Sequence, residues 1–304
     1  MKNQIKFISS SLLSATLLCC LGSAAADQPA KVGLAGSVDT TLPVEKALDP
    51  KSDAKDAKID PFSGKGAIDT TQVTGPKTLI YSIKPGLSKA EDGTQKITNQ
   101  VEVDYGVDLY GRTVELHCIS NWTREATLND DGSRNRQSGF ESATCGAKTQ
   151  VYNNEEKGLS ASVAVDVQSP IVIGHALADR DPNFHVIIPF NVMKTLADGK
   201  AAVVGTITSD HTFGGGTEIT YGGGAGMRLS STNAVESNMT RSTYGTVTND
   251  VVCSHQAEGD NKLYYVRVWR QRSGDPPSSG KGVEVGIEIT REPNQGATPI
   301  LFKK

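Results

Sequence analysis

The stretch VEVDYGVDLYGRTVELHCI, residues 101–119, sets the pattern that the rest of the chain repeats. From Val101 to Leu109 the apolar side chains occupy odd positions, and the acidic side chains fall only on even positions. Successive side chains of a β-strand point to opposite faces, so this alternation predicts a strand with one apolar and one polar face. After Gly111 the apolar side chains move to even positions, which predicts a turn or a bulge at residues 110–112.

Strand-like segments and turn signals recur to the end of the chain. Clean alternation is found at residues 79–83, 159–167, 263–270 and 283–289. Apolar runs at residues 171–173 and 184–190 are typical of strands that are covered on both faces. The dipeptides Asp92-Gly93 and Asp198-Gly199 predict tight turns between paired strands.

Many short strands without an amphipathic helix predict an all-β protein of the antiparallel β-sandwich class. The strands form one sandwich, or two packed sandwiches divided near Gly158. A short helix over residues 191–198 is the competing interpretation of one predicted strand. An outer-membrane barrel would also need alternating segments of about ten residues. Scarce apolar aromatics, continuous apolar strands that do not suit a polar lumen, and a long leader count against it.

The N-terminal 75 residues fall into two parts of different composition. Residues 1–26 have a basic start, an apolar run and an Ala-Ala-Ala cleavage signal, which predict a secretory signal peptide. A membrane anchor, and a lipoprotein that uses Cys19 or Cys20, are the alternatives. Residues 27–75 contain one aromatic side chain and a run of alternating charges, so they predict a disordered linker. The β-sandwich-like domain then spans residues 76–304.

The charge and the signal limit the class of protein. The signal peptide carries two lysines and no acidic residue, so the formal charge of −3 becomes −5 after cleavage. This mild acidity disfavours a nucleic-acid-binding protein, which usually has a basic face. The signal is of the bacterial type, so the mature protein is expected in the periplasm, on the cell surface or in the medium.

Three cysteines follow the signal peptide: Cys118, Cys145 and Cys253. In an oxidising compartment they predict one disulfide and one odd cysteine. Cys118 with Cys145 is the preferred pair because it closes one polar excursion, which stabilises the fold by about 3 to 4 kcal/mol in the chain-entropy model. Cys118 with Cys253 stays an alternative. The sequence has no CxxC or HxxxH spacing, so neither a metal nor another cofactor is expected.

A candidate ligand-binding face lies in residues 263–270, where Tyr265, Arg267 and Trp269 share one face of a strand. Flat aromatic rings beside a guanidinium can stack on sugar rings or on aromatic partners. These three residues are therefore the predicted binding residues. The alternative is that they cover the second face of a sandwich, with the arginine stem packed and its head group in solvent.

The sequence offers little evidence of a catalytic site. Glu102 and Asp104 would lie about 6.6 Å apart on one strand face, a separation that suits the paired carboxylates of a glycosidase. Any alternating acidic strand gives this spacing, and no GxSxG elbow is present. The predicted function is a non-catalytic binding or surface-structural protein of the bacterial cell envelope, with an envelope glycan or another surface protein as its partner. The alternative is a secreted hydrolase that acts on a polysaccharide through Glu102 and Asp104.

Overall fold

The computed structural model describes residues 59–128, 131–170, 175–178, 180–257, 259–274 and 277–292. The predicted signal peptide, the first part of the predicted linker and the apolar run 171–173 lie outside these residues. The described residues form twelve strands: β1 Leu79–Ala90, β2 Gln95–Leu109, β3 Arg112–Leu128, β4 Arg134–Asn154, β5 Leu159–Ser169, β6 His185–Leu196, β7 Ala201–Thr212, β8 Thr217–Arg228, β9 Asn233–Ser242, β10 Val247–His255, β11 Lys262–Gly274 and β12 Pro277–Arg291. No helix in these ranges is long and apolar enough to cross a membrane.

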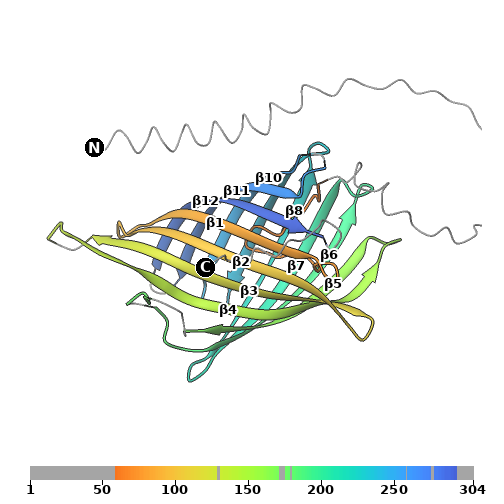
Figure 1. Ribbon diagram of the computed structural model, residues 1–304. Coiled ribbons are helices and arrows are strands. Elements are labelled where there is room, and N and C mark those ends of the chain that lie inside the picture. The colour runs from red at the N-terminus through yellow and green to blue at the C-terminus, as the bar shows by residue number, and fades with distance from the viewer. Residues whose placement is uncertain are drawn as a thin grey trace, which may run out of the picture.

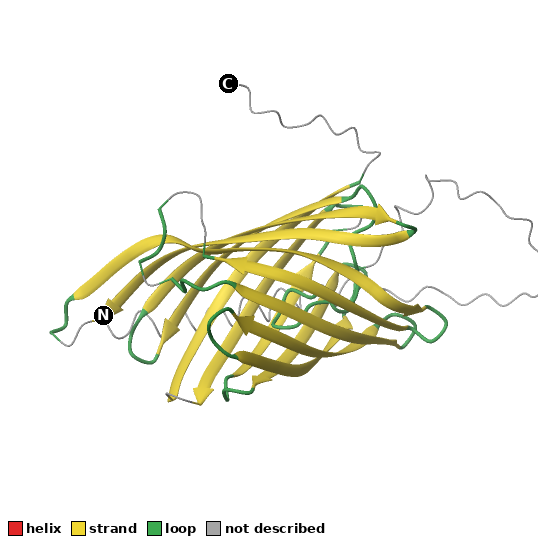
Figure 2. Ribbon diagram, turned by 90° about the horizontal axis from the view of Figure 1, so that it is seen from below, coloured by secondary structure: helices red, strands yellow, loops and turns green. Residues whose placement is uncertain are grey.

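The twelve strands close into one barrel (Figure 1, Figure 2). Each strand pairs antiparallel with its neighbours in the sequence, and β1 also pairs with β12, where Leu79 lies opposite Arg291. The all-β class is therefore confirmed, but the sandwich prediction is wrong. Gly158 lies in the turn between β4 and β5, and these two strands pair with each other, so the chain is not divided there.

Several of the tight turns between strands contain residues with positive φ. Tyr110 and Gly111 have φ values of 53° and 75°, as a two-residue type I′ turn between β2 and β3 requires. The turn predicted there is confirmed. Ala197 and Asp198 also have positive φ, in the turn between β6 and β7. Residues 191–196 belong to strand β6, so the helix alternative is wrong.

The barrel carries its apolar side chains on the outside. On β2, Val103 and Tyr105 point outward and are 42% and 41% exposed, whereas Asp104 points inward and is 8% exposed. A sheet in a water-soluble protein has the reverse arrangement, with its apolar face buried. Exposed large apolar side chains occur on every strand, and one from each is Ile83, Val101, Leu116, Val151, Val165, Ile188, Val203, Ile219, Met239, Val251, Tyr264 and Val285.

Residues 175–178, which lie between β5 and β6, cover an edge of β4. Strand β4 extends past the end of β5, and Ala176 pairs with Phe140 along that extension. Phe140 donates its N–H to the carbonyl of His175, and Leu177 donates its N–H to the carbonyl of Phe140. A Cβ at Gly139 would lie 2.4 Å from the Leu177 nitrogen, so this close approach requires glycine.

Residues 59–75, named the plug, lie inside the barrel at the end where β1 begins and β12 ends, named the first rim (Figure 1). The plug starts beside the turn between β8 and β9, where Ile59 donates its N–H to the carbonyl of Ser231. Its side chains Phe62 and Ile68 are 2% and 1% exposed. The last part of the predicted disordered linker is therefore packed inside the barrel.

Candidate functional site

The side of the lumen formed by β6–β10, named the docking wall, carries an apolar patch that receives the plug. Phe62 and Ile68 of the plug form a buried cluster with Met193 of β6 and with Ala202 and Val204 of β7. These three wall residues are inward-facing apolar side chains, whereas the buried side chains of β9 and β10 are mostly polar. Burial of a large apolar side chain is worth about 1.5–3 kcal/mol, so this patch anchors the plug.

The docking wall also binds the plug backbone through two carboxylates. Glu236 of β9 accepts the backbone N–H groups of three plug residues, at 2.7, 3.3 and 3.1 Å from Ser63, Gly64 and Gly66. Asp250 of β10 accepts the N–H of Ala67 at 2.6 Å. Glu236 and Asp250 are both 3% exposed. Because charge-assisted hydrogen bonds are about twice as strong as neutral ones, these contacts fix the path of the plug backbone.

The opposite side of the lumen, formed by β12 and β1–β5 and named the cavity wall, holds the plug mainly through side chains. Lys65 of the plug forms an ion pair with Glu288 of β12. Lys148 of β4 binds Asp69 of the plug, with its Nζ 2.7 Å from Oδ2. Thr74 donates both its N–H and its hydroxyl to Glu115 of β3, at 2.7 and 2.8 Å.

Lys65 stays charged in this position. Burial alone would lower the pKa of the Lys65 ammonium, but the carboxylates of Glu288, Glu102 and Asp69 outweigh burial. The pKa of Lys65 therefore lies above its usual range. The plug thus places the ammonium group of Lys65 among the carboxylates of the cavity wall.

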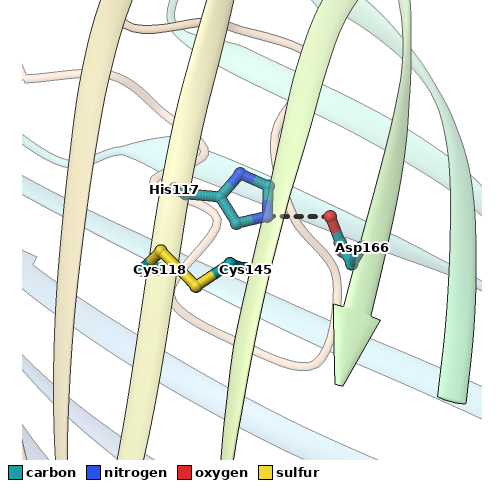
Figure 3. The surroundings of a disulfide bond; sticks show 4 residues. All are labelled: His117, Cys118, Cys145 and Asp166. Carbon is teal, nitrogen blue, oxygen red and sulfur yellow. Dashed lines mark hydrogen bonds and ion pairs between the residues drawn. A yellow bond between two sulfur atoms is a disulfide. The ribbon is translucent and has the colours of Figure 1, made fainter. Parts of the chain in front are cut away.

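A cavity of about 480 Å³ lies between the plug and the cavity wall. Its wall side is lined mainly by charged side chains, among them Lys84, Glu102, Asp104, Glu115, His117 and Asp166. Three buried atoms there have no hydrogen-bond partner, namely Asp104 Oδ1, His117 Nδ1 and Glu288 Oε2, and the last of these is ion-paired with Lys65. The other ring nitrogen of His117, Nε2, lies 2.8 Å from Asp166 Oδ1 (Figure 3). The cavity is therefore polar, and the plug leaves some hydrogen-bonding atoms of its wall without a partner.

Cys118 of β3 and Cys145 of β4 are joined by a disulfide (Figure 3). The two residues lie directly opposite each other in the register of these strands. Both are exposed on the outer surface, whereas the neighbouring His117 points into the lumen. The disulfide therefore links two adjacent strands from outside and leaves the lumen unchanged.

The three predicted binding residues line the lumen instead of forming an exposed platform. Tyr265 is 2% exposed and donates its hydroxyl to Glu284 at 3.2 Å. Arg267 binds Asp250, with Nη2 2.8 Å from Oδ2. Tyr265 and Trp269 each lie over a glycine of β12, Gly286 and Gly282 respectively, where a Cβ would clash with the ring. Ligand binding by these residues stays a prediction.

Glu102 and Asp104 share the inner face of β2, as the alternation indicates, but their surroundings do not resemble a catalytic pair. Glu102 forms an ion pair with Lys84 of β1 and accepts a hydrogen bond from Ser82. Asp104 has no such partner. Among the described residues, no group of three or more His, Cys, Asp or Glu side chains is arranged to hold a metal ion.

Sequence reasoning missed the residues that hold the plug. Lys65, Asp69, Glu236 and Glu288 carry no local motif, and their partners are far away in the sequence. The one usable signal was Phe62, the single large aromatic in a polar segment. A lone aromatic in such a segment indicates a point that is anchored by burial.

No protein-family model matches the sequence, and no curated protein sequence matches it. Solved structures match the fold. An outer membrane channel from Pseudomonas putida F1 is 12% identical with a TM-score of 0.55, and the match covers 75% of this chain and 100% of that chain. The KdgM porin is 11% identical with a TM-score of 0.47, over 69% of this chain and 99% of that chain. The CymD monoaromatic hydrocarbon channel is 9% identical with a TM-score of 0.40, over 78% and 98%.

The likeness to the Pseudomonas channel shows that this chain has the fold of an outer-membrane β-barrel. The predicted binding or surface-structural β-sandwich protein is therefore wrong, and so is the alternative of a secreted hydrolase. The described residues form a closed barrel with an apolar exterior, which neither prediction included. Export to the cell envelope agrees with this fold, but a free periplasmic or secreted protein does not.

Proposed function

We propose that this protein is an outer-membrane channel whose lumen is closed at the first rim by the plug. The observation that carries the proposal is the reversal of the two faces: apolar side chains cover the outside, and buried charged side chains line the inside. In a membrane every backbone hydrogen bond must be made within the protein, and a closed barrel satisfies this condition. An apolar outer band around a polar interior is the pattern of outer-membrane barrels.

The strand number supports a lumen that needs a plug. Barrels of about eight strands are filled by their own side chains, and barrels of about 16–18 strands leave an aqueous channel. A barrel of twelve strands lies between these cases. Here the extra room holds residues 59–75 and a cavity of about 480 Å³. Without the plug, this room would form a polar passage.

The test is conductance in planar lipid bilayers. The full chain is compared with a variant that lacks residues 59–75, after both have been folded into phosphatidylcholine vesicles and checked by circular dichroism. We expect rare, small conductance steps from the full chain and frequent, larger steps from the deletion variant. A folded deletion variant that does not conduct ions would overturn the channel proposal.

A second variant keeps this test decisive if the deletion prevents folding. Combining Phe62→Ala with Glu236→Ala removes two anchors of the plug and keeps the chain at full length. This variant is expected to conduct like the deletion variant. Met239→Ala serves as the control because Met239 lies on the outer surface and is 58% exposed.

A further inference from the structure

The cavity beside the plug has an uneven charge balance. Each of the three lysines near it has its own carboxylate, in the pairs Lys65 with Glu288, Lys84 with Glu102 and Lys148 with Asp69. Asp166 binds His117. Four more carboxylates line the same cavity and have no lysine or arginine partner among the described residues: Asp60, Asp104, Glu115 and Asp166. Of these four, only Asp104 has a buried oxygen without a hydrogen-bond partner.

Asp104 is buried as well as unpaired. The residue is 8% exposed, and its Oδ1 atom has no hydrogen-bond partner. Lys65 is the nearest plug cation, but it forms its ion pair with Glu288. A buried carboxylate oxygen without a donor costs free energy, so such a group in a folded protein calls for an explanation. A bound donor in the cavity would provide one.

His117 supplies a second acceptor beside Asp104. The two residues lie directly opposite each other in the register of β2 and β3. In the neutral ring Nε2–H donates to Asp166, which leaves a lone pair on Nδ1. Nδ1 is buried and has no hydrogen-bond partner. The Oε1 atom of Glu115 lies 3.9 Å from it, which places a further acceptor on the same wall.

We propose that this cavity binds a small organic cation, whose ammonium or guanidinium N–H groups donate to Asp104 Oδ1 and His117 Nδ1. These two unpartnered acceptors lie on a wall that carries more carboxylates than lysines, so they match N–H donors that carry positive charge. A volume of about 480 Å³ lies in the range of small-molecule sites and far exceeds a single ion. The inference rests on the proposed channel function, because it names the class of solute that the lumen selects.

The test is isothermal titration of the full-length protein in detergent with butylammonium. Butyrate, which has the same number of carbon atoms and the opposite charge, is the matched ligand. We expect butylammonium to bind saturably and butyrate not to bind. Asp104→Asn should weaken butylammonium binding by about tenfold or more, the loss of one charged hydrogen bond.

Glu125→Gln is the matched protein control. Glu125 lies on β3, the strand of His117, but near its other end, where its Oε2 is 3.2 Å from the Nζ of Lys96. This variant should bind butylammonium like the unmodified chain. If Asp104→Asn does not fold, His117→Phe provides the second test, because it keeps a ring and removes the Nδ1 acceptor. It should also weaken binding.

Two results would overturn the site: no binding of butylammonium to the unmodified chain, or equal binding after Asp104→Asn. The titration does not depend on ion flow, so the two proposals can fail separately. Conductance without butylammonium binding would overturn the cation site and leave the channel standing. Binding without conductance in the folded plug-deleted variant would overturn the channel and leave the site standing.

Discussion

The docking wall and the cavity wall meet the same plug in different ways. On the docking wall, apolar side chains bury Phe62, and Glu236 accepts three backbone N–H groups. On the cavity wall, the plug is held by ion pairs, a cavity of about 480 Å³ remains, and Asp104 Oδ1 lacks a partner. The docking wall leaves a smaller cavity of about 320 Å³ beside the plug and two unpartnered amide oxygens, Asn191 Oδ1 and Asn238 Oδ1. The walls therefore differ in the size of the cavity and in the charge of the unpartnered group, and the larger cavity with its carboxylate indicates room for a charged solute.

Phe62→Ala should reduce the difference between the two walls most strongly. The side chain is 2% exposed within the apolar cluster, and its truncation should reduce the free energy of plug docking by about 3–5 kcal/mol. Hydrogen exchange of the plug amides, measured by mass spectrometry on the protein in detergent, should then become much faster. Unchanged exchange of residues 59–75 would show that the apolar patch is not an anchor.

Glu236→Ala should have the next largest effect. It leaves the buried N–H groups of Ser63, Gly64 and Gly66 without their acceptor, which should weaken docking by about 2–3 kcal/mol. Faster exchange is expected at these three amides first. Glu236→Gln keeps one acceptor oxygen and should exchange more slowly than Glu236→Ala. Equal exchange of the two variants would contradict the assigned role of the carboxylate.

Lys148→Met should change plug docking only slightly. Its partner Asp69 has a side chain that is 52% exposed, so water can replace the lost ammonium. A partly exposed ion pair contributes at most about 1 kcal/mol. The same hydrogen-exchange measurement should therefore give nearly the native rates. A loss as large as that of Phe62→Ala would mean that the two walls anchor the plug equally.

Asp104→Asn should have the smallest effect on stability, with the opposite sign. It removes a buried charge that has no hydrogen bond to lose at Oδ1. The free energy of unfolding should be unchanged or rise by up to about 1 kcal/mol. Urea titration of the protein folded into vesicles measures this change. A clear loss of stability would show that Asp104 already has a stabilising partner, and would remove the contrast between the walls.

Strands and turns could be predicted from the sequence because their signals are local. The odd positions from Val101 to Leu109 share one face, and the turn at Tyr110 and Gly111 falls where the phase changes. Whether that apolar face points into the protein or out of it could not be predicted in the same way. Alternation is identical whether the apolar face meets a protein core or a lipid, so the surrounding medium decides.

One observation that disfavoured a barrel has a structural explanation. Residues 184–190 are apolar on both faces, which does not suit a lumen filled with water. Phe184 and Phe190 point outward and are 40% and 41% exposed. Pro189 faces the cavity beside the plug. The second apolar face of this strand therefore belongs to an interior that the plug partly fills.

The plug could not be predicted because its contacts join distant parts of the chain. Ser63 and Glu236 are separated by 173 positions, and Ala67 and Asp250 by 183. Composition alone suggested disorder, since the segment is polar and contains few large side chains. Burial inside a finished barrel supplies the apolar contacts that the segment lacks by itself.

The position of Ile59 has a consequence for assembly. One end of the plug lies next to β1, and the other, Ile59, lies beside Ser231 in the turn between β8 and β9. Both places belong to the first rim, so the segment doubles back instead of running from one mouth to the other. The twelve strands can therefore receive residues 59–75 through the first rim alone, while the seam between β1 and β12 stays closed.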